Sequence, residues 1–464
     1  MGDTPRVVII GGGFAGIEAA KALGRAPVSV TLVDATNHHV FQPLLYQVAS
    51  AALAPSDVAV PIRWLLRRQR NTTVLLGTVV DIDEDRRAVR LEDRSALPYD
   101  YLIVAAGSRH SYFGHDEWES CAPGLKTLAD ATEMRNRFLL AFERSERAAD
   151  PVARDEWLTI VIVGGGPTGV ELAGIMASIA RHAIQKDFRR VDTAKARIIL
   201  LEGGPRLIPA FREKLSERAA RDLRKLGVDV RLNAIVTKIE PSAVWIGEER
   251  IATRTIFWAA GNRASPLSET LDAPVDRAGH VNVSGDLSVP GHPEIFVAGD
   301  QANVKQADGS PVPRVAQGGM QMGRTAARNI LRDLAGKPRK DFRYQTHGDL
   351  AVIGRYRAVA QFPWFSFTGI FAWLLWLFVH ILYLAGFRNR LSVLIEWGYE
   401  FVTWQRGSRL IVEHFRRDPA PWSGDGASRG ALELQRPQAG VQRPDVERER
   451  MPAEAAPPAR PGES

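Results

Sequence analysis

The feature that most constrains the fold of this chain is a glycine-rich turn between an apolar run and a helical pattern, close to the first residue. The run at 6–10 leads into GGGFAG at 11–16, and the helical pattern continues from Ile17 to Leu23. In such a strand–turn–helix unit the first glycine permits the turn, the second lets the backbone approach a pyrophosphate, and the third lets the helix pack on the strand. The helix N-terminus then faces the phosphates. The residues predicted to form this site are Gly11, Gly13, Phe14, Ala15 and Gly16.

A carboxylate completes the unit. The next apolar run, 28–33, ends at Asp34, about 20 residues on, where an acidic side chain accepts hydrogen bonds from both ribose hydroxyls. A glycine turn alone would fit a plain structural loop, whereas the strand, the helix and Asp34 together favour nucleotide binding. The first unit therefore predicts an adenine dinucleotide site.

The same pattern returns after an expected linker at Asp150–Pro151. An apolar run at 157–163 leads into GGGPTGVE, and the next strand ends at Glu202. A carboxylate there repels a 2′-phosphate and accepts ribose hydroxyls, which favours NAD over NADP, although the nearby Arg206 is a residue that accommodates a phosphate. The residues predicted for this second site are Gly164, Gly166, Pro167, Thr168, Gly169, Glu171 and Glu202.

Each unit also closes in a strand that ends in small residues, and a third such strand follows them. Small residues let backbone lie against a flavin or its phosphates, although a tight exit turn gives the same pattern. The third strand delivers an acid at its carboxyl end, and a small-residue-rich helix at 313–327 follows it. The residues concerned are Ala106 and Gly107 in the first unit, Ala260 and Gly261 in the second, and Asp300 after the third strand.

Two units with one internal order indicate a duplication, and 464 residues are too many for one hydrophobic core. We expect an α/β protein with two Rossmann-like dinucleotide-binding domains and C-terminal membrane-associated helices. The expected division is 1–125 and 281–345 for the first domain, 126–280 for the second, 346–416 for membrane attachment, and 417–464 for a disordered tail.

The cysteine count narrows the chemistry. Cys121 is the only cysteine, so the chain forms no internal disulfide and no CxxC redox pair, and it offers no cysteine cluster for a metal. We expect no metal site and a reducing compartment. The formal charge of +7 comes without a basic run interleaved with stacking aromatics, so an anionic membrane surface is favoured over nucleic acid as its partner.

The C-terminal third predicts membrane contact. No charged residue occurs from Ala358 to Phe387, and the segment is rich in tryptophan and phenylalanine. It is long enough to cross a bilayer, yet aromatic rings with flanking arginines suit the interface. An amphipathic helical pattern follows at 391–402. In-plane attachment is the favoured interpretation, with a true span and a buried or dimer-forming helix as the alternatives.

Several motifs, in order, resemble those of the type II NADH dehydrogenases, within the two-dinucleotide-binding-domain flavoproteins of glutathione-reductase-like fold. These are FQPLLYQVA at 41–49, GGGPTGVE at 164–171, and AQGGMQ at 316–321, in which two glycines replace the expected alanine-type residues. The resemblance covers roughly residues 5–410. It implies FAD in the first unit, with Gln42, Ala316 and Gln317 among its contacts, and NADH in the second. It also implies that Glu171, Gln317 and Gln321 are catalytic residues at the nicotinamide and quinone.

The function implied is non-proton-pumping NADH:quinone oxidoreduction, in which a hydride passes from NADH to FAD and two electrons pass to menaquinone or ubiquinone. We expect a homodimer at the cytoplasmic face of the cell membrane, peripheral or monotopic. The alternatives are a soluble NADH-dependent ferredoxin- or rubredoxin-type reductase, an apoptosis-inducing-factor-like flavoprotein, and a non-enzymatic redox sensor. A dithiol reductase is excluded because it needs two cysteines beside the flavin.

Overall fold

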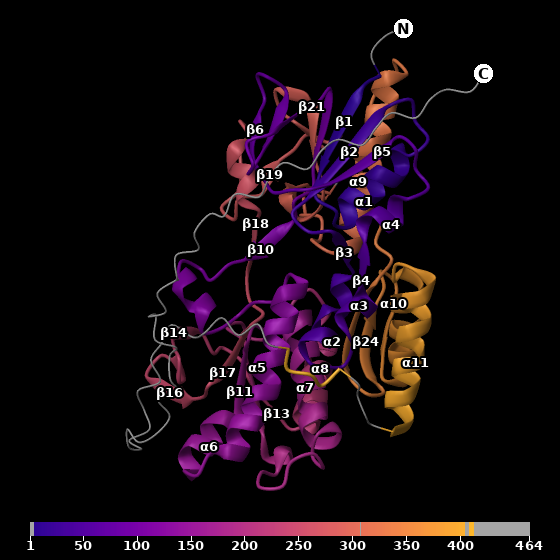
Figure 1. Ribbon diagram of the computed structural model, residues 1–464. Helices are drawn as coiled ribbons and strands as arrows, with labels where there is room; N and C mark the ends of the chain where they lie inside the picture. Colours follow the sequence, from indigo (N-terminus) through magenta and orange to yellow (C-terminus); the bar gives the residue numbers. More distant parts are fainter. Residues whose placement is uncertain (1–3, 307, 404–407, 413–464) are drawn as a thin grey trace, which may run out of the picture. The chain divides into compact units, whose positions relative to one another are not determined.

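The computed structural model describes residues 4–306, 308–403 and 408–412 (Figure 1). The tail predicted to be disordered, 417–464, lies outside the described residues, as do the residues beyond 412 of the expected attachment region.

The first glycine turn leads out of a six-stranded sheet. Its strands, in chain order, are β1 (Arg6–Ile10), β2 (Ser29–Asp34), β5 (Thr72–Leu76), β9 (Tyr101–Val104), β20 (Ser288–Val289) and β21 (His292–Val297). Their spatial order is β20-β21-β9-β1-β2-β5, parallel except between β20 and β21. Strands of a parallel sheet are covered on both faces, which is why these are nearly continuous runs of Val, Ile and Leu.

A late segment completes this sheet. β21 pairs in parallel with β9, with Ile295 opposite Leu102 and Val297 opposite Val104. The helix α9 (Ala316–Leu334) then packs along α1 (Phe14–Leu23), and both bury their apolar faces in the core of the first sheet. The chain thus leaves the first unit, builds the second, and returns.

The second glycine turn leads out of a four-stranded parallel sheet of order β13-β12-β11-β17. Its strands are β11 (Thr159–Val163), β12 (Arg197–Leu201), β13 (Val228–Arg231) and β17 (Thr255–Trp258), and the helices of this unit are α5 (Leu128–Arg147), α6 (Pro151–Leu158), α7 (Pro167–Ser178) and α8 (Glu213–Lys225). Both units therefore have the predicted α/β order, and the expected duplication is confirmed.

Each unit also carries a three-stranded antiparallel sheet. In the first this is β6 (Val79–Asp83), β7 (Ala88–Leu91) and β8 (Ala96–Pro98), and in the second β14 (Val236–Glu240), β15 (Ala243–Ile246) and β16 (Glu249–Ala252). No strand was predicted at β14 and β16, where Lys238, Glu249 and Arg250 are charged and exposed.

Shorter elements connect these sheets. Between β2 and β5 the chain forms β3 (His38–Val40), α2 (Leu45–Ala49), α3 (Pro55–Val58), β4 (Ala59–Pro61) and α4 (Ile62–Leu66). Two antiparallel strands, β10 (Ser108–His110) and β18 (Asn262–Ala264), pair where the chain passes between the two units. β19 (Val281–Asn282) pairs with β22 (Ala302–Asn303).

The prediction of a linker at Asp150–Pro151 is wrong. Pro151 is the first residue of α6, and the Asp150 carboxylate accepts hydrogen bonds from the backbone N–H groups of Val152 and Ala153 at 3.2 and 3.1 Å. Asp before Pro is a favoured helix start, because proline suits the first helical position and the carboxylate satisfies free N–H groups. The same dipeptide therefore begins a helix here.

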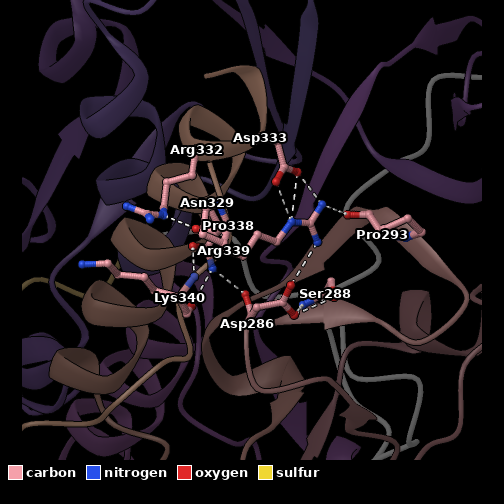
Figure 2. Close-up of polar contacts among 9 residues, drawn as sticks. All are labelled: Asp286, Ser288, Pro293, Asn329, Arg332, Asp333, Pro338, Arg339 and Lys340. Atoms are coloured by element: carbon pink, nitrogen blue, oxygen red, sulfur yellow. Dashed lines mark hydrogen bonds and ion pairs between the residues drawn. The ribbon is translucent and has the colours of Figure 1, made fainter. Parts of the chain in front are cut away.

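The end of α9 is fastened to the loops around β20 by a polar cluster (Figure 2). The Arg339 guanidinium pairs with both Asp286 and Asp333 and donates to the carbonyl of Pro293 at 2.8 Å. From α9, the Asn329 amide donates to the carbonyls of Asp286 and Lys340, at 3.0 and 2.9 Å. These bonds hold the returning part of the chain on the first sheet.

The uncharged aromatic run does not form one helix. It contributes to the antiparallel sheet β23 (Asp349–Gly354), β24 (Arg357–Gln361) and β25 (Ser366–Thr368), and then forms α10 (Ile370–Tyr383). The amphipathic helix predicted at 391–402 begins earlier, as α11 (Phe387–Thr403). Within the described residues, no helix is both long enough and apolar enough to cross a bilayer.

Gly323 provides a stability prediction, because α1 and α9 cross at this residue. A Cβ atom there would lie 2.0 Å from the carbonyl oxygen of Ala15, whereas one at Gly319 would come no nearer than 3.6 Å to any neighbour. Gly323→Ala should therefore lower the free energy of unfolding by about 1–3 kcal/mol, as overpacking does. Gly319→Ala, in the same helix, is the matched control. Equal denaturant midpoints for both variants would show that the crossing has room for a methyl group.

Candidate functional site

The first glycine turn is shaped by contacts that only glycine permits. Gly11 has φ +100°, and a Cβ at Gly16 would lie 1.8 Å from the carbonyl oxygen of Gly11. A Cβ at Gly13 would have no neighbouring atom within 4 Å. The turn thus packs tightly on the strand side and opens in front of α1, where a pyrophosphate meets the helix N-terminus.

Asp34 holds this turn from the end of β2. One of its carboxylate oxygens accepts a hydrogen bond from the Gly12 N–H at 2.6 Å, and the other accepts from the Thr36 N–H at 2.6 Å and its hydroxyl at 2.7 Å. The sequence predicted this carboxylate beside the turn. It did not predict that His39 is buried, with Nδ1 2.9 Å from the Gly12 carbonyl oxygen.

The second turn repeats this arrangement. Gly164 has φ +110°, and a Cβ at Gly169 would again lie 1.8 Å from the carbonyl oxygen of the first glycine. Glu202 accepts from the N–H of Gly165 and from that of Gly204, both at 2.6 Å. A Cβ at Gly166 would have no neighbour within 4 Å. The two turns therefore share their shape and their carboxylate bond.

Arg206, which the sequence offered as a phosphate ligand, is turned to the backbone. Its guanidinium donates to the carbonyls of Phe211 at 3.3 Å and Pro209 at 2.8 Å. Since two of its nitrogens are committed to carbonyl oxygens, the arrangement favours a nucleotide without a 2′-phosphate.

Small residues line the remaining strand ends as predicted. Gly107 and Gly261 have φ of +72° and +70°, which favours glycine. A Cβ at Gly261 would press on Phe113 and Ser111 at 2.7 Å. The other predicted residues lie beside these turns: Phe14, Ala15, Pro167 and Thr168 at the starts of α1 and α7, Ala106 and Ala260 before the two glycines, and Ala316 at the start of α9.

Asp300 lies where the first and third strand ends meet. Its carboxylate accepts a hydrogen bond from the Ser108 hydroxyl at 2.9 Å, and the next residue, Gln301, accepts from the Ala106 N–H through its side-chain oxygen at 3.0 Å. The Gln301 amide nitrogen is buried and has no hydrogen-bond partner in the described part of the chain. A buried donor without a partner is costly in native proteins, so this group fits a ligand acceptor such as those of FAD.

The two glutamines of AQGGMQ bind backbone. Gln317 donates to the carbonyl of Gly348 at 2.9 Å and accepts from the N–H of His347 at 2.9 Å. Gln321 donates to the carbonyl of Gln345 at 2.8 Å and accepts from the N–H of the same residue at 2.9 Å. Each amide thus uses one donor and its oxygen to hold the segment that leads into β23. No feature of the sequence predicts these contacts.

Glu171 lies on α7, where β23 crosses it. A Cβ at Gly174 would lie 1.8 Å from the carbonyl oxygen of Ile353, so this glycine lets the strand rest directly on the helix. The crossing brings the Val352 N–H 3.4 Å from the Glu171 carboxyl group. Burial raises the pKa of Glu171 to about 8, because a charged carboxylate is poorly solvated there, and the Val352 bond opposes the shift only in part. This shift favours the protonated form of the carboxyl group near neutral pH.

Comparison with known proteins agrees with this geometry. The pyridine nucleotide-disulphide oxidoreductase family matches residues 5–323, and the NDH2 C-terminal domain matches residues 347–403. The type II NADH:quinone oxidoreductase Ndh of Mycobacterium tuberculosis is 44% identical over 88% of this chain and 90% of its own length. The type II NADH:quinone oxidoreductase of Haemophilus influenzae is 29% identical over 76% and 86%.

The fold agrees with solved structures too. The structure of NDH2 from Plasmodium falciparum in complex with NADH has a TM-score of 0.79 at 20% identity, covering 88% of this chain and all of that one. These matches favour NADH:quinone oxidoreduction over the soluble NADH-dependent reductases given above as alternatives. The chain belongs to the type II NADH:quinone oxidoreductases, which are FAD-dependent enzymes.

Proposed function

We propose that this enzyme binds FAD at the first turn, through Asp34, Ala106 and Asp300, and NADH at the second, through Glu202 and Gly261. The observation that carries this assignment is the repeated pair of turns, each open in front of a helix and each held by a carboxylate 2.6 Å from the middle glycine. Two dinucleotide sites in one chain fit a hydride donor and a flavin acceptor.

The reaction balances without a protein thiol. When bound, FAD accepts the hydride of NADH and passes its two electrons to the quinone. NADH becomes NAD⁺, and the quinone becomes a quinol by gaining two electrons and two protons, one derived from the hydride and one from solvent. The work left to the chain is to hold the two rings close and to supply protons to the quinone.

The two proposed nucleotide sites also divide the chain into domains. We propose that residues 1–125 and 281–345 form the FAD domain and residues 126–280 the NADH domain. The pairing of β21 with β9 supports the return at 281, because it places the Asp300 segment beside Ala106.

We further propose that residues 346–416 attach the enzyme in the plane of the membrane, at its cytoplasmic face and as a homodimer. Within the described part of this region, α10 and α11 lie next to each other (Figure 1) and expose large apolar side chains along both helices. Apolar surfaces larger than a few hundred Å² mark protein or membrane contacts. The exposed residues on these helices are Ile370, Phe371, Leu374, Phe378, Leu382, Tyr383, Phe387, Leu391, Leu394, Ile395, Tyr399, Phe401 and Val402, and Trp364 and Phe365 are exposed just before β25.

The direct test of the function and of the NADH site is steady-state turnover with a soluble quinone analogue. The purified protein should be yellow and oxidise NADH much faster than NADPH. Glu202→Gln should narrow that preference by about tenfold or more, because removing one charge repulsion near a 2′-phosphate is worth about 1–2 kcal/mol. Glu143→Gln, an exposed change on α5, is the control. Colourless protein that takes up no FAD would exclude the function, and an unaltered preference would exclude Glu202 as the ribose ligand.

The protonated Glu171 predicts a pH dependence. Because the pKa of this group is raised to about 8, the carboxyl group donates a proton below that pH and loses this ability as the pH rises through it. Quinone reduction should therefore fall above about pH 8 in the wild type. In Glu171→Gln, which is neutral at every pH, that fall should disappear, while NADH still reduces the flavin. If the pH profile of the variant matched the wild type, Glu171 would not be the proton donor.

The membrane proposal is tested on exposed residues, so that folding is spared. Phe371 and Phe378 are 74% and 65% exposed, and the double substitution by glutamine should weaken sedimentation with lipid vesicles at least about tenfold, given the transfer free energy of two phenylalanines. FAD content and reduction by NADH should not change. The matched control is the double substitution of Leu76 and Val152 by glutamine, since these residues are 63% and 66% exposed on other elements. Equal vesicle binding by both variants would assign the apolar face to another contact.

A further inference from the structure

Lys126 is a partly buried lysine that no step above uses. Its ammonium nitrogen donates a hydrogen bond to the Ser108 hydroxyl at 3.0 Å, and that hydroxyl in turn donates to Asp300. Among the described residues, no carboxylate lies within ion-pair distance of Lys126. Burial lowers the pKa of Lys126, and the attraction of Asp300 opposes that shift. A largely buried ammonium group without a direct ion partner is costly unless something else stabilises its charge.

The backbone of Lys126 is fixed on both sides. Its N–H donates to the Asp130 carboxylate at 3.0 Å, within the capping box that starts α5. Its carbonyl accepts a hydrogen bond from the Gln42 amide at 3.4 Å. These two bonds hold the backbone of Lys126, and the Ser108 hydroxyl is the contact that orients its ammonium group.

The neighbours of Lys126 are the residues proposed to bind FAD. Gln42 contacts its backbone, Asp300 is linked to its ammonium group through Ser108, and the Ala106–Gly107 strand end directly precedes Ser108. The positive charge thus lies in a partly buried position beside the residues proposed to bind the cofactor. A charge in a water-poor site acts over longer distances than one in water.

We propose that Lys126 is the positive charge that this enzyme places beside the flavin, where it stabilises the negative charge that the ring gains on hydride transfer. A hydride brings two electrons and one proton to a neutral ring, so one unit of negative charge is added while NADH becomes NAD⁺. A fixed cation stabilises that charge without reorganisation, and charge near the ring is one of the means by which proteins tune flavins. The inference rests on the proposed FAD contacts of Gln42 and Asp300.

The role predicts a change in flavin electronics beyond any change in rate. Lys126→Met should lower the two-electron midpoint potential of the bound FAD by about 30 mV or more, which corresponds to about tenfold in the reduction equilibrium. It should also weaken the adduct with sulfite, which adds to the ring and leaves a negative charge on it, by about tenfold or more. Lys126→Arg keeps the charge and should restore most of both values. Lys238→Met, which removes an exposed lysine paired with Glu240 on β14, should alter neither.

The measurements use the purified holoenzyme, with dye equilibration for the potential and spectral titration for sulfite. An unchanged potential and sulfite affinity in Lys126→Met would overturn the proposal. So would weaker FAD binding at an unchanged potential, since that pattern assigns the ammonium group to the FAD phosphates. If Lys126→Met does not retain FAD, Lys126→Gln, which can still donate to Ser108, replaces it in the same titrations. Reduction of the wild-type flavin by NADH is measured before any variant is made. Its failure would contradict the proposed function and not the role of Lys126.

Discussion

The hydrogen bond between a strand-end carboxylate and the middle glycine of each turn is the interaction on which both nucleotide sites depend. Asp34 holds Gly12 and Glu202 holds Gly165, in each case at 2.6 Å. The bond ties the end of the second strand to the turn after the first, so the protein's own contacts hold the turn in front of the helix. A carboxylate has about four acceptor positions, and Glu202 uses two of them on backbone N–H groups. The others would serve the ribose hydroxyls of the proposed NADH.

Local sequence predicted this core because its signals are local. Valine- and isoleucine-rich runs, a glycine-rich turn and a carboxylate at the end of the next strand all occur within one strand–helix–strand segment. What the sequence did not predict depends on context. β14 and β16 have exposed, charged residues that read as turns, and Asp150–Pro151 suits a linker as well as a helix start. The aromatic run was compatible with one long helix. In the structure its first residues belong to β24, which pairs with β23.

The candidate site shows the same limit more sharply. The sequence did not predict the contacts of His39, Gln301 and Lys126, because each is made with a residue that is not a near neighbour in the chain: Gly12, Ala106 and Ser108 respectively. Gln301 directly follows Asp300, so its position beside a predicted ligand was the one available signal. For a lone lysine before a helix no signal existed, since most lysines are solvated.

The two glutamines of AQGGMQ connect α9 to the segment that leads into β23. Gln317 and Gln321 on α9 hold the backbone at 345–348, which leads directly into β23. β23 rests on α7 at Gly174, and its Val352 N–H reaches Glu171. One continuous path of backbone contacts therefore links the helix that follows Asp300 to the carboxyl group proposed as proton donor. Replacing either glutamine would loosen this path as well as remove any contact with a quinone, so loss of activity in such a variant does not by itself identify a quinone ligand. The burial that raises the pKa of Glu171 depends on the same path. Loosening the path would therefore shift the pH profile of quinone reduction, whereas loss of a quinone contact alone would leave that profile unchanged.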